Sequence, residues 1–166
     1  MADEIELDEN DETILDAVWD KLGGKKAAKR RESINSMATA LHVGARGDQT
    51  ITVTDDLTAV AMGSGSLPVL STPAMIALME SAALAAIDSL LPEGQSSVGI
   101  EINVRHLSAT PVGEEIIASA IVTQIDGKRI TFEVRAWDRR ELIGEGTHVR
   151  YIIDELRFMS RLGSDD

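Results

Sequence analysis

The strongest constraint on the fold is one long apolar segment, residues 72–87, that contains a single charged side chain. Glu80 is the only charged residue between Asp56 and Asp88. The positions three and four residues away, which would share its side of a helix, are all apolar: Ile76, Ala77, Ala83 and Leu84. A helix that is apolar on nearly all sides is usually buried, and an isolated carboxylate there is costly unless it has a function. The segment therefore predicts a central helix with Glu80 as a candidate functional residue. The alternative is that Glu80 marks the solvated stripe of an amphipathic helix.

Residues at both ends of this segment support a helix. Thr72 is a suitable N-cap, and Pro73 suits the first helical turn. Pro92-Glu-Gly94 would end the element after roughly five turns.

One strand pattern precedes the predicted helix and four follow it. Apolar and β-branched residues predict strands over 50–54, 98–104, 116–125, 130–136 and 142–153. Asp126-Gly127 is a strong hairpin signal, and Asp138-Arg139-Arg140 indicates a second antiparallel step. A doubly wound fold would alternate strands and helices, so this order excludes it. The order predicts an α+β chain with a hot-dog fold, in which a curved antiparallel meander wraps around one central helix.

The first forty residues differ from the rest of the chain. An acidic run over 1–12 precedes apolar residues at helical spacing and then a basic cluster over 25–31. We therefore predict a partly helical N-terminal extension over 1–40, a hot-dog domain over 41–162 and a disordered tail over 163–166. The extension is interpreted equally well as a docking helix or as loosely packed, solvated chain.

Composition limits the partners and the chemistry. The net charge of −12 argues against nucleic acid, because phosphate binding needs a concentrated basic surface. No uncharged apolar run reaches the roughly 20 residues of a membrane span, and the acidic N-terminus is unlike a signal peptide, so we expect a cytoplasmic protein that does not bind membranes. The absence of cysteine excludes disulfides and thiolate chemistry. His42, His106 and His148 lack metal-ligand spacing, so no metal site is predicted, and His42 and His148 are assigned structural roles.

Three segments together resemble the hot-dog thioesterase family related to fluoroacetyl-CoA thioesterase. They are Val69-Leu-Ser-Thr-Pro-Ala-Met-Ile-Ala-Leu-Met-Glu80, Val98-Gly-Ile-Glu-Ile-Asn-Val-Arg-His-Leu-Ser-Ala-Thr-Pro-Val-Gly113 and Gly144-Glu-Gly-Thr-His-Val-Arg150. The resemblance extends from about Leu41 to Met159. It implies that Thr72, Glu80 and His106 form the catalytic set of a thioester hydrolase. It also implies, on weaker motifs, that Gly99 and Arg150 bind the substrate.

These residue types suit the implied reaction. Thioester hydrolysis needs a base or nucleophile, a proton carrier and donors for the developing oxyanion. Glu80 among apolar neighbours would serve as base or nucleophile, either directly or through water. His106 would orient Glu80 or protonate the leaving thiolate, and the Thr72 hydroxyl would hold the carbonyl oxygen. The resemblance further implies a homodimer with the acyl pocket between subunits, and no cofactor beyond the coenzyme A of the substrate.

The loop before the predicted helix departs from the fluoroacetyl-specific relative. That enzyme has phenylalanines in its lid, whereas the loop Gly63-Ser-Gly-Ser-Leu-Pro-Val-Leu70 contains no aromatic residue. We therefore expect another short or medium acyl-CoA, or an acyl group on a carrier protein. Two other functions remain open at this point, because fold alone does not determine the reaction. They are a non-catalytic acyl-CoA-binding sensor or interaction module, and a hot-dog enoyl-CoA hydratase or dehydratase.

Overall fold

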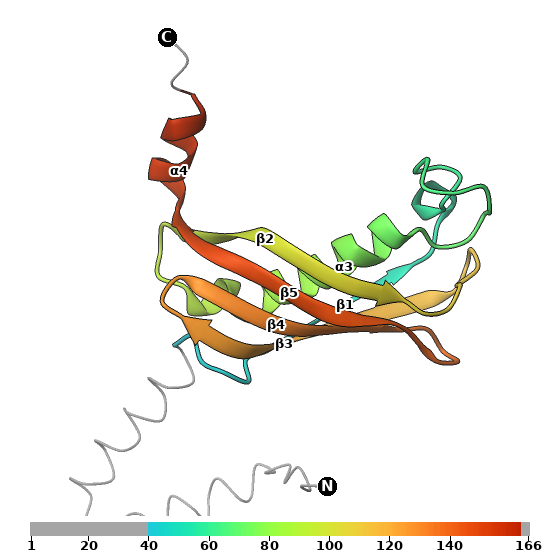
Figure 1. The fold of residues 1–166 in the computed structure, drawn as a ribbon, viewed down its shortest axis with the longest axis horizontal. Helices are drawn as coiled ribbons and strands as arrows, with labels where there is room; N and C mark the ends of the chain where they lie inside the picture. Colours follow the sequence, from blue (N-terminus) through green and yellow to red (C-terminus); the bar gives the residue numbers. More distant parts are fainter. Residues whose placement is uncertain (1–39, 164–166) are drawn as a thin grey trace, which may run out of the picture. The chain divides into compact units, whose positions relative to one another are not determined.

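A curved sheet of five antiparallel strands wraps around one long helix, α3 (Thr72–Ile87), in the computed structural model, which describes residues 40–163 (Figure 1). The strands are β1 (Arg46–Thr52), β2 (Gln95–His106), β3 (Glu115–Asp126), β4 (Arg129–Trp137) and β5 (Leu142–Asp154). Short 3₁₀ turns η1 (Asp55–Leu57) and η2 (Asp88–Leu90) flank α3, and a last helix, α4 (Glu155–Leu162), follows β5. The predicted hot-dog fold is confirmed. The predicted extension over 1–40 lies, except for Ala40, outside the described residues.

The order of strands in the sheet is β1-β3-β4-β5-β2. The predicted hairpin at Asp126-Gly127 joins β3 to β4, and Gly127 has the positive φ (57°) that such a turn requires. The turn after β4 leads into β5 as expected. The prediction of a continuous four-strand meander is wrong at β2, which pairs with β5 and not with β3. Alternation within a strand identifies its buried face but does not identify its neighbour.

Small residues bring α3 into direct backbone contact with β1. A Cβ atom added to Gly47 would overlap the carbonyl oxygen of Ala82 and the amide nitrogen of Ala86. A Cβ atom on Gly144 of β5 would likewise overlap the sulfur of Met75. These close approaches allow the sheet to curve over one side of the helix. The fully buried side chains between them include Met75, Met79, Ile87, Ile116, Phe132 and Ile143.

The other side of α3 is open in the single chain. Its exposed residues are mostly small or apolar and comprise Thr72, Pro73, Ala77, Ser81 and Ala85. The Glu80 side chain lies at the boundary of the two sides and is 42% exposed. The expectation of a helix buried on all sides is therefore wrong for one chain. By length and composition alone Thr72–Leu90 could cross a membrane, but one side of this helix forms the core of the domain.

The C-terminal helix α4 was not predicted from the sequence. Asp154 caps it by accepting a hydrogen bond from the Arg157 amide at 2.8 Å. The helix projects away from the sheet next to the end of β5 (Figure 1). No residue of α4 is buried, and Leu156 is 86% exposed.

The contact at Gly47 makes a stability prediction. We expect Gly47→Ala to lower the free energy of unfolding by at least about 2 kcal/mol, because the added methyl group meets helix backbone that cannot rotate away. Urea unfolding at matched protein concentration would measure the change. Gly163→Ala is the control, since nothing lies closer than 4.0 Å to the added atom. Equal stability of the two variants would contradict direct packing of α3 on β1.

Candidate active site

The first turn of α3 leaves the Thr72 side chain available for another contact. Ser71, and not Thr72 as predicted, is the N-cap, because its hydroxyl accepts a hydrogen bond from the Ala74 amide at 3.1 Å. Thr72 is the first helical residue, and its hydroxyl oxygen lies 2.9 Å from Nδ1 of His106 at the end of β2. Thr72 and His106 thus form a hydroxyl–imidazole pair between the central helix and the sheet.

The other ring nitrogen of His106 faces no partner in the part of the chain that the structure describes. Nε2 is buried and has no hydrogen-bond partner within residues 40–163. Burial lowers the pKa of His106 below its ordinary value of 6.5, and a hydrogen bond with the Ser108 backbone acts in the opposite direction. The neutral ring is therefore favoured near pH 7. A neutral imidazole with one unsatisfied nitrogen is suited to exchange a proton with a ligand.

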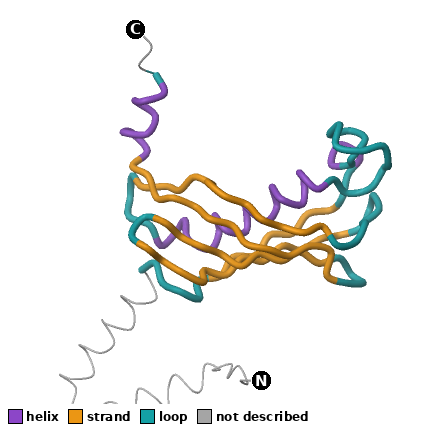
Figure 2. The backbone as a smooth tube through the Cα atoms, viewed as in Figure 1, coloured by secondary structure: helices purple, strands orange, loops and turns teal. Residues whose placement is uncertain are grey.

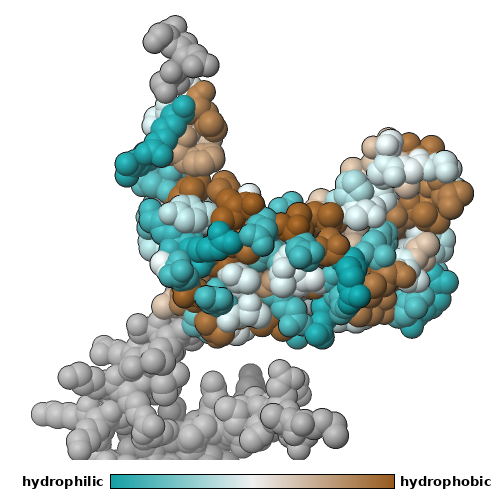
Figure 3. Space-filling view, viewed as in Figure 1, coloured by the Kyte–Doolittle hydropathy of each residue, from teal (hydrophilic) through white to brown (hydrophobic). Residues whose placement is uncertain are grey.

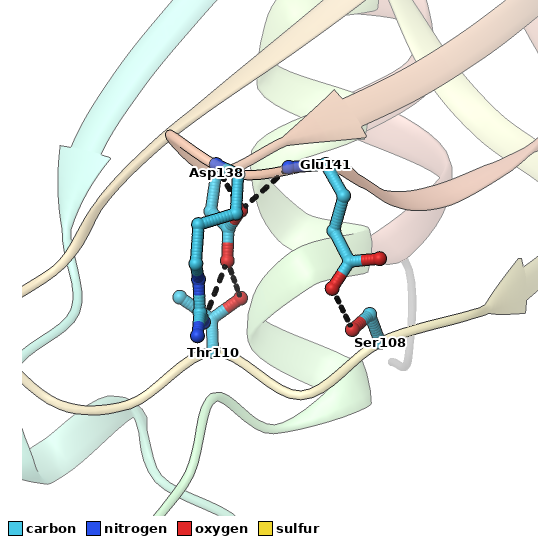
Figure 4. Close-up of polar contacts among 5 residues, drawn as sticks. Ser108, Thr110, Asp138 and Glu141 are labelled. Atoms are coloured by element: carbon cyan, nitrogen blue, oxygen red, sulfur yellow. Dashed lines mark hydrogen bonds and ion pairs between the residues drawn. The ribbon is translucent and has the colours of Figure 1, made fainter.

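The turn between β4 and β5 fixes the segment that follows His106 (Figure 4). The buried Asp138 side chain accepts hydrogen bonds from the amides of Arg140 and Glu141 at 2.8 and 3.0 Å, and from the Thr110 hydroxyl at 3.3 Å. The Ser108 hydroxyl donates to the Glu141 carboxylate at 2.7 Å. Burial raises the pKa of Asp138, but the two amides and the nearby Arg140 guanidinium outweigh it, so that the pKa is lowered and the carboxylate stays charged.

The same turn also supports the start of α3. The Thr110 carbonyl accepts a hydrogen bond from the Leu70 amide at 2.8 Å, two residues before Thr72. The loops after β1, β2 and β4 gather at this end of the sheet (Figure 2). Sequence reasoning identified the turn at Asp138 but missed its link to both members of the Thr72–His106 pair.

Glu80 belongs to a second group, two turns further along α3. Its Oε1 atom lies 3.8 Å from Nε2 of His148 on β5. A Cβ atom on Gly99 of β2 would lie 2.6 Å from the same oxygen, so the carboxylate occupies space that only a glycine leaves. Arg150 is also close enough for the charge of Glu80 to raise the pKa of its guanidinium, although burial is the larger effect and lowers it. The predicted residues Glu80, Gly99 and Arg150 therefore come together.

His148, which was assigned a structural role, is part of this second group. Its buried ring stacks on Phe132 with the ring centroids 6.0 Å apart. Nδ1 lies 2.8 Å from the Glu101 carbonyl, which can only accept, so Nδ1 carries the proton. Burial lowers the pKa of His148, and Nε2 of the neutral ring is an acceptor. The Gly-Thr-His-x-Arg segment of the sequence could have indicated that His148 belongs with Arg150. The two residues are two positions apart in a strand and therefore point to the same face of β5.

Within one chain the two groups are separate. Thr72 and Glu80 are eight residues apart, which corresponds to about 12 Å along the helix axis. A surface pocket of about 350 Å³ adjoins the first group and not the second. Its lining residues are Ala59, Ser64, Val69, Leu70, Thr72, His106, Leu107, Ser108 and Ala109. No cluster of His, Asp and Glu that could hold a metal ion occurs within residues 40–163.

The two buried histidines make a prediction about pH. We expect the free energy of unfolding to fall as the pH is lowered from about 7.5 to about 5.5. Over this range the histidines of the unfolded chain take up protons, whereas the buried rings of His106 and His148 in the folded chain stay neutral. His148→Gln should make this slope shallower by at most about 1.4 kcal/mol per pH unit. Urea unfolding across the range measures both slopes. Stability that does not change with pH would show that neither ring is held neutral.

Comparisons with known proteins agree with this fold. The family model described as fluoroacetyl-CoA-specific thioesterase matches residues 53–156. The fluoroacetyl-CoA thioesterase of Streptantibioticus cattleyicolor is 35% identical over 94 residues, which cover 57% of this chain and 68% of that protein. A solved structure of a fluoroacetyl-CoA thioesterase superposes with a TM-score of 0.72 at 28% identity, covering 76% of this chain and 98% of the other.

A hot-dog-like protein from Thermanaerovibrio acidaminovorans superposes with a TM-score of 0.67 at 26% identity and covers 72% of this chain and 89% of its own. The fold, the extent of the family match and the named relatives lead to one assignment. The chain belongs to the fluoroacetyl-CoA-specific thioesterase family, whose named members hydrolyse thioesters.

Proposed function

We propose that this protein is an acyl-CoA or acyl-carrier thioesterase whose catalytic residues are Thr72, Glu80 and His106. The observation that carries the proposal is the 2.9 Å contact between the Thr72 hydroxyl and the His106 ring at the edge of an open pocket. Gly99 and Arg150 bind the substrate in this proposal, because they adjoin the Glu80 carboxylate. Coenzyme A enters as part of the substrate, and the chemistry needs no further cofactor.

Each catalytic residue has a distinct role in this proposal. Glu80 attacks the thioester carbonyl or activates the water that does so. The Thr72 hydroxyl, at the N-terminal end of α3, stabilises the oxyanion that develops on the carbonyl oxygen. His106 protonates the departing thiolate through Nε2, the ring nitrogen without a partner in the described chain.

The proposed enzyme is a homodimer in which each site uses both copies. Strand β2 is an edge strand, and its exposed apolar residues include Ile100 and Ile102. Edge pairing of β2 with β2 of a second copy would satisfy its open backbone groups and cover the exposed side of α3. Because Thr72 and Glu80 are about 12 Å apart along one helix, we place Glu80 of one copy opposite the Thr72–His106 pair of the other.

The proposed substrate differs from that of the named relative. The 63–70 loop carries no aromatic side chain, and the lining of the pocket is small or aliphatic apart from its polar residues Ser64, Thr72, His106 and Ser108. An open groove of this composition suits an aliphatic acyl chain better than selection of a small fluorinated group. We therefore expect a short or medium acyl chain, carried on coenzyme A or on a carrier protein.

Thiol release from acetyl- to dodecanoyl-CoA by wild type and Glu80→Gln tests the reaction. We expect the wild type to hydrolyse a limited range of chain lengths and the variant to be at least about a hundredfold slower, the scale of losing a base or nucleophile. Glu93→Gln, an exposed acid outside α3, is the control. Thermal stabilisation by acyl-CoA without turnover would support the sensor instead. Loss of enoyl-CoA absorbance would support a hydratase.

Mixing two inactive variants tests the shared site. Co-expressed Glu80→Gln and His106→Ala chains should regain about a quarter of wild-type activity, because about half of the dimers are mixed and each has one intact site of two. Each variant alone supplies the background. If the mixed dimers purify but are as inactive as their parents, Glu80 and His106 act within one chain.

A further inference from the structure

The helix α4 has an apolar face with no partner within residues 40–163. Leu156, Met159 and Leu162 recur at intervals of three residues and are exposed. The helix begins where β5 pairs with the start of β2. Asp154 is paired with Gln95, and the Glu155 amide donates to the Gly94 carbonyl at 3.1 Å. The apolar face is therefore presented at one end of the edge strand.

A second set of exposed apolar side chains lies at the other end of β2. The loop over 55–70 carries Val60, Met62 and Leu67, of which Leu67 is 63% exposed. Its end is fixed to the segment after His106 by the hydrogen bond from the Leu70 amide to the Thr110 carbonyl. Strand β2 has 12 residues and is therefore about 36 Å long. Helix α4 and the 55–70 loop of one chain thus lie too far apart to touch.

The surface between these two features is hollowed. In the space-filling view α4 and the 55–70 loop rise at opposite ends of the described domain, and the apolar side of α4 faces the hollow between them (Figure 3). Strand β2 runs between the two raised ends (Figure 1). A second chain that pairs with β2 would have to enter this hollow.

Two-fold symmetry determines what such a second chain brings to each end. An edge strand that pairs with its own copy about a two-fold axis perpendicular to the sheet is antiparallel to it. The start of one β2 then lies beside the end of the other. The α4 helix of the second copy is therefore carried to the 55–70 loop of the first, and the same contact repeats at the other end.

We infer that α4 of each copy docks through Leu156, Met159 and Leu162 on the exposed apolar residues of the 55–70 loop of the other copy. This inference rests on the homodimer of the proposed function. The occupant is a second copy because the two surfaces lie at opposite ends of the one edge strand, which is the arrangement that a two-fold axis brings together.

The basic side chains of α4 do not interrupt the docking face formed by its apolar residues. At about 3.6 residues per turn, Arg157 and Arg161 lie on the opposite side of α4 from Leu156, Met159 and Leu162. Both guanidinium groups can therefore remain in solvent when the apolar face is covered.

The docked helix would form part of the substrate pocket. Ala59, Ser64 and Val69 of the loop line the pocket beside Thr72 and His106. A helix from the second copy lying on this loop adds apolar wall to a groove that is open in the single chain. It would also hold the loop in place next to the Thr72–His106 pair. The loop contains Gly63 and Gly65. Near α3 the Ser71 amide donates to the Leu57 carbonyl at 2.9 Å, and the Ser71 hydroxyl contacts the Met62 sulfur.

Cysteine crosslinking of the full chain tests the inference, and the natural sequence has no cysteine to interfere. Leu67→Cys and Leu156→Cys single variants are mixed under conditions that exchange subunits and are then oxidised. We expect up to about half of the protein in the mixture to become a covalent dimer on a denaturing gel, because about half of the dimers contain one chain of each variant. The pair Val60→Cys and Met159→Cys is a second probe. Ile121→Cys on β3, mixed with Leu156→Cys, is the matched control and should not crosslink.

Three outcomes would overturn the inference. They are a monomer by light scattering, a dimer without the crosslinks between loop and α4, and equal crosslinking by either single variant alone. The gel does not depend on catalysis. A crosslinked but inactive protein would therefore remove the thioesterase proposal and leave the docking of α4 in place, and an active dimer without the crosslink would do the reverse.

Discussion

The direct contact between α3 and β1 at Gly47 sets the orientation of the helix that carries Thr72 and Glu80. Because the helix backbone lies against the strand, the side of α3 that contains Ala82 and Ala86 must face the sheet. This orientation places Glu80 at the boundary between the buried and exposed sides and directs it towards Gly99 of β2. A larger residue at position 47 would push the helix away from the sheet and change this geometry. The position of the Glu80 carboxylate therefore depends on the packing of small residues between α3 and β1.

Local patterns predicted the elements well because each pattern has a local cause. The apolar segment from Thr72 predicted the central helix. Alternation and enrichment in β-branched residues predicted all five strands, with ends shifted by a few residues. The pairing of β2 with β5 could not be predicted, because it joins segments about fifty residues apart and depends on how the whole sheet closes. Helix α4 was missed because its eight residues are too few for periodicity to separate a helix from a polar tail.

The candidate site was predicted in its residue types but not in its grouping. Thr72, Glu80 and His106 were expected to act together, and one chain brings only Thr72 to His106. The N-cap shows how one residue changes the interpretation. Because the Ser71 hydroxyl caps the helix, the Thr72 hydroxyl is not needed for capping and can contact His106. The hydrogen bond between Asp138 and Thr110 was missed for a similar reason. A turn aspartate that accepts from two amides looks the same in sequence whether or not it also accepts from a distant hydroxyl.

The surroundings of Glu80 explain why its carboxylate is accessible for chemistry. His148 cannot donate to it while neutral, because the ring proton is on Nδ1 and is used by the Glu101 carbonyl. Arg150 supplies the compensating positive charge, but its guanidinium is held by the side chain and the carbonyl of Ser97 at 2.8 and 2.7 Å. Two fixed hydrogen bonds keep the cation close to Glu80 without a direct bond to it. A lysine would supply the charge but not this geometry, because it lacks the planar fork of donors.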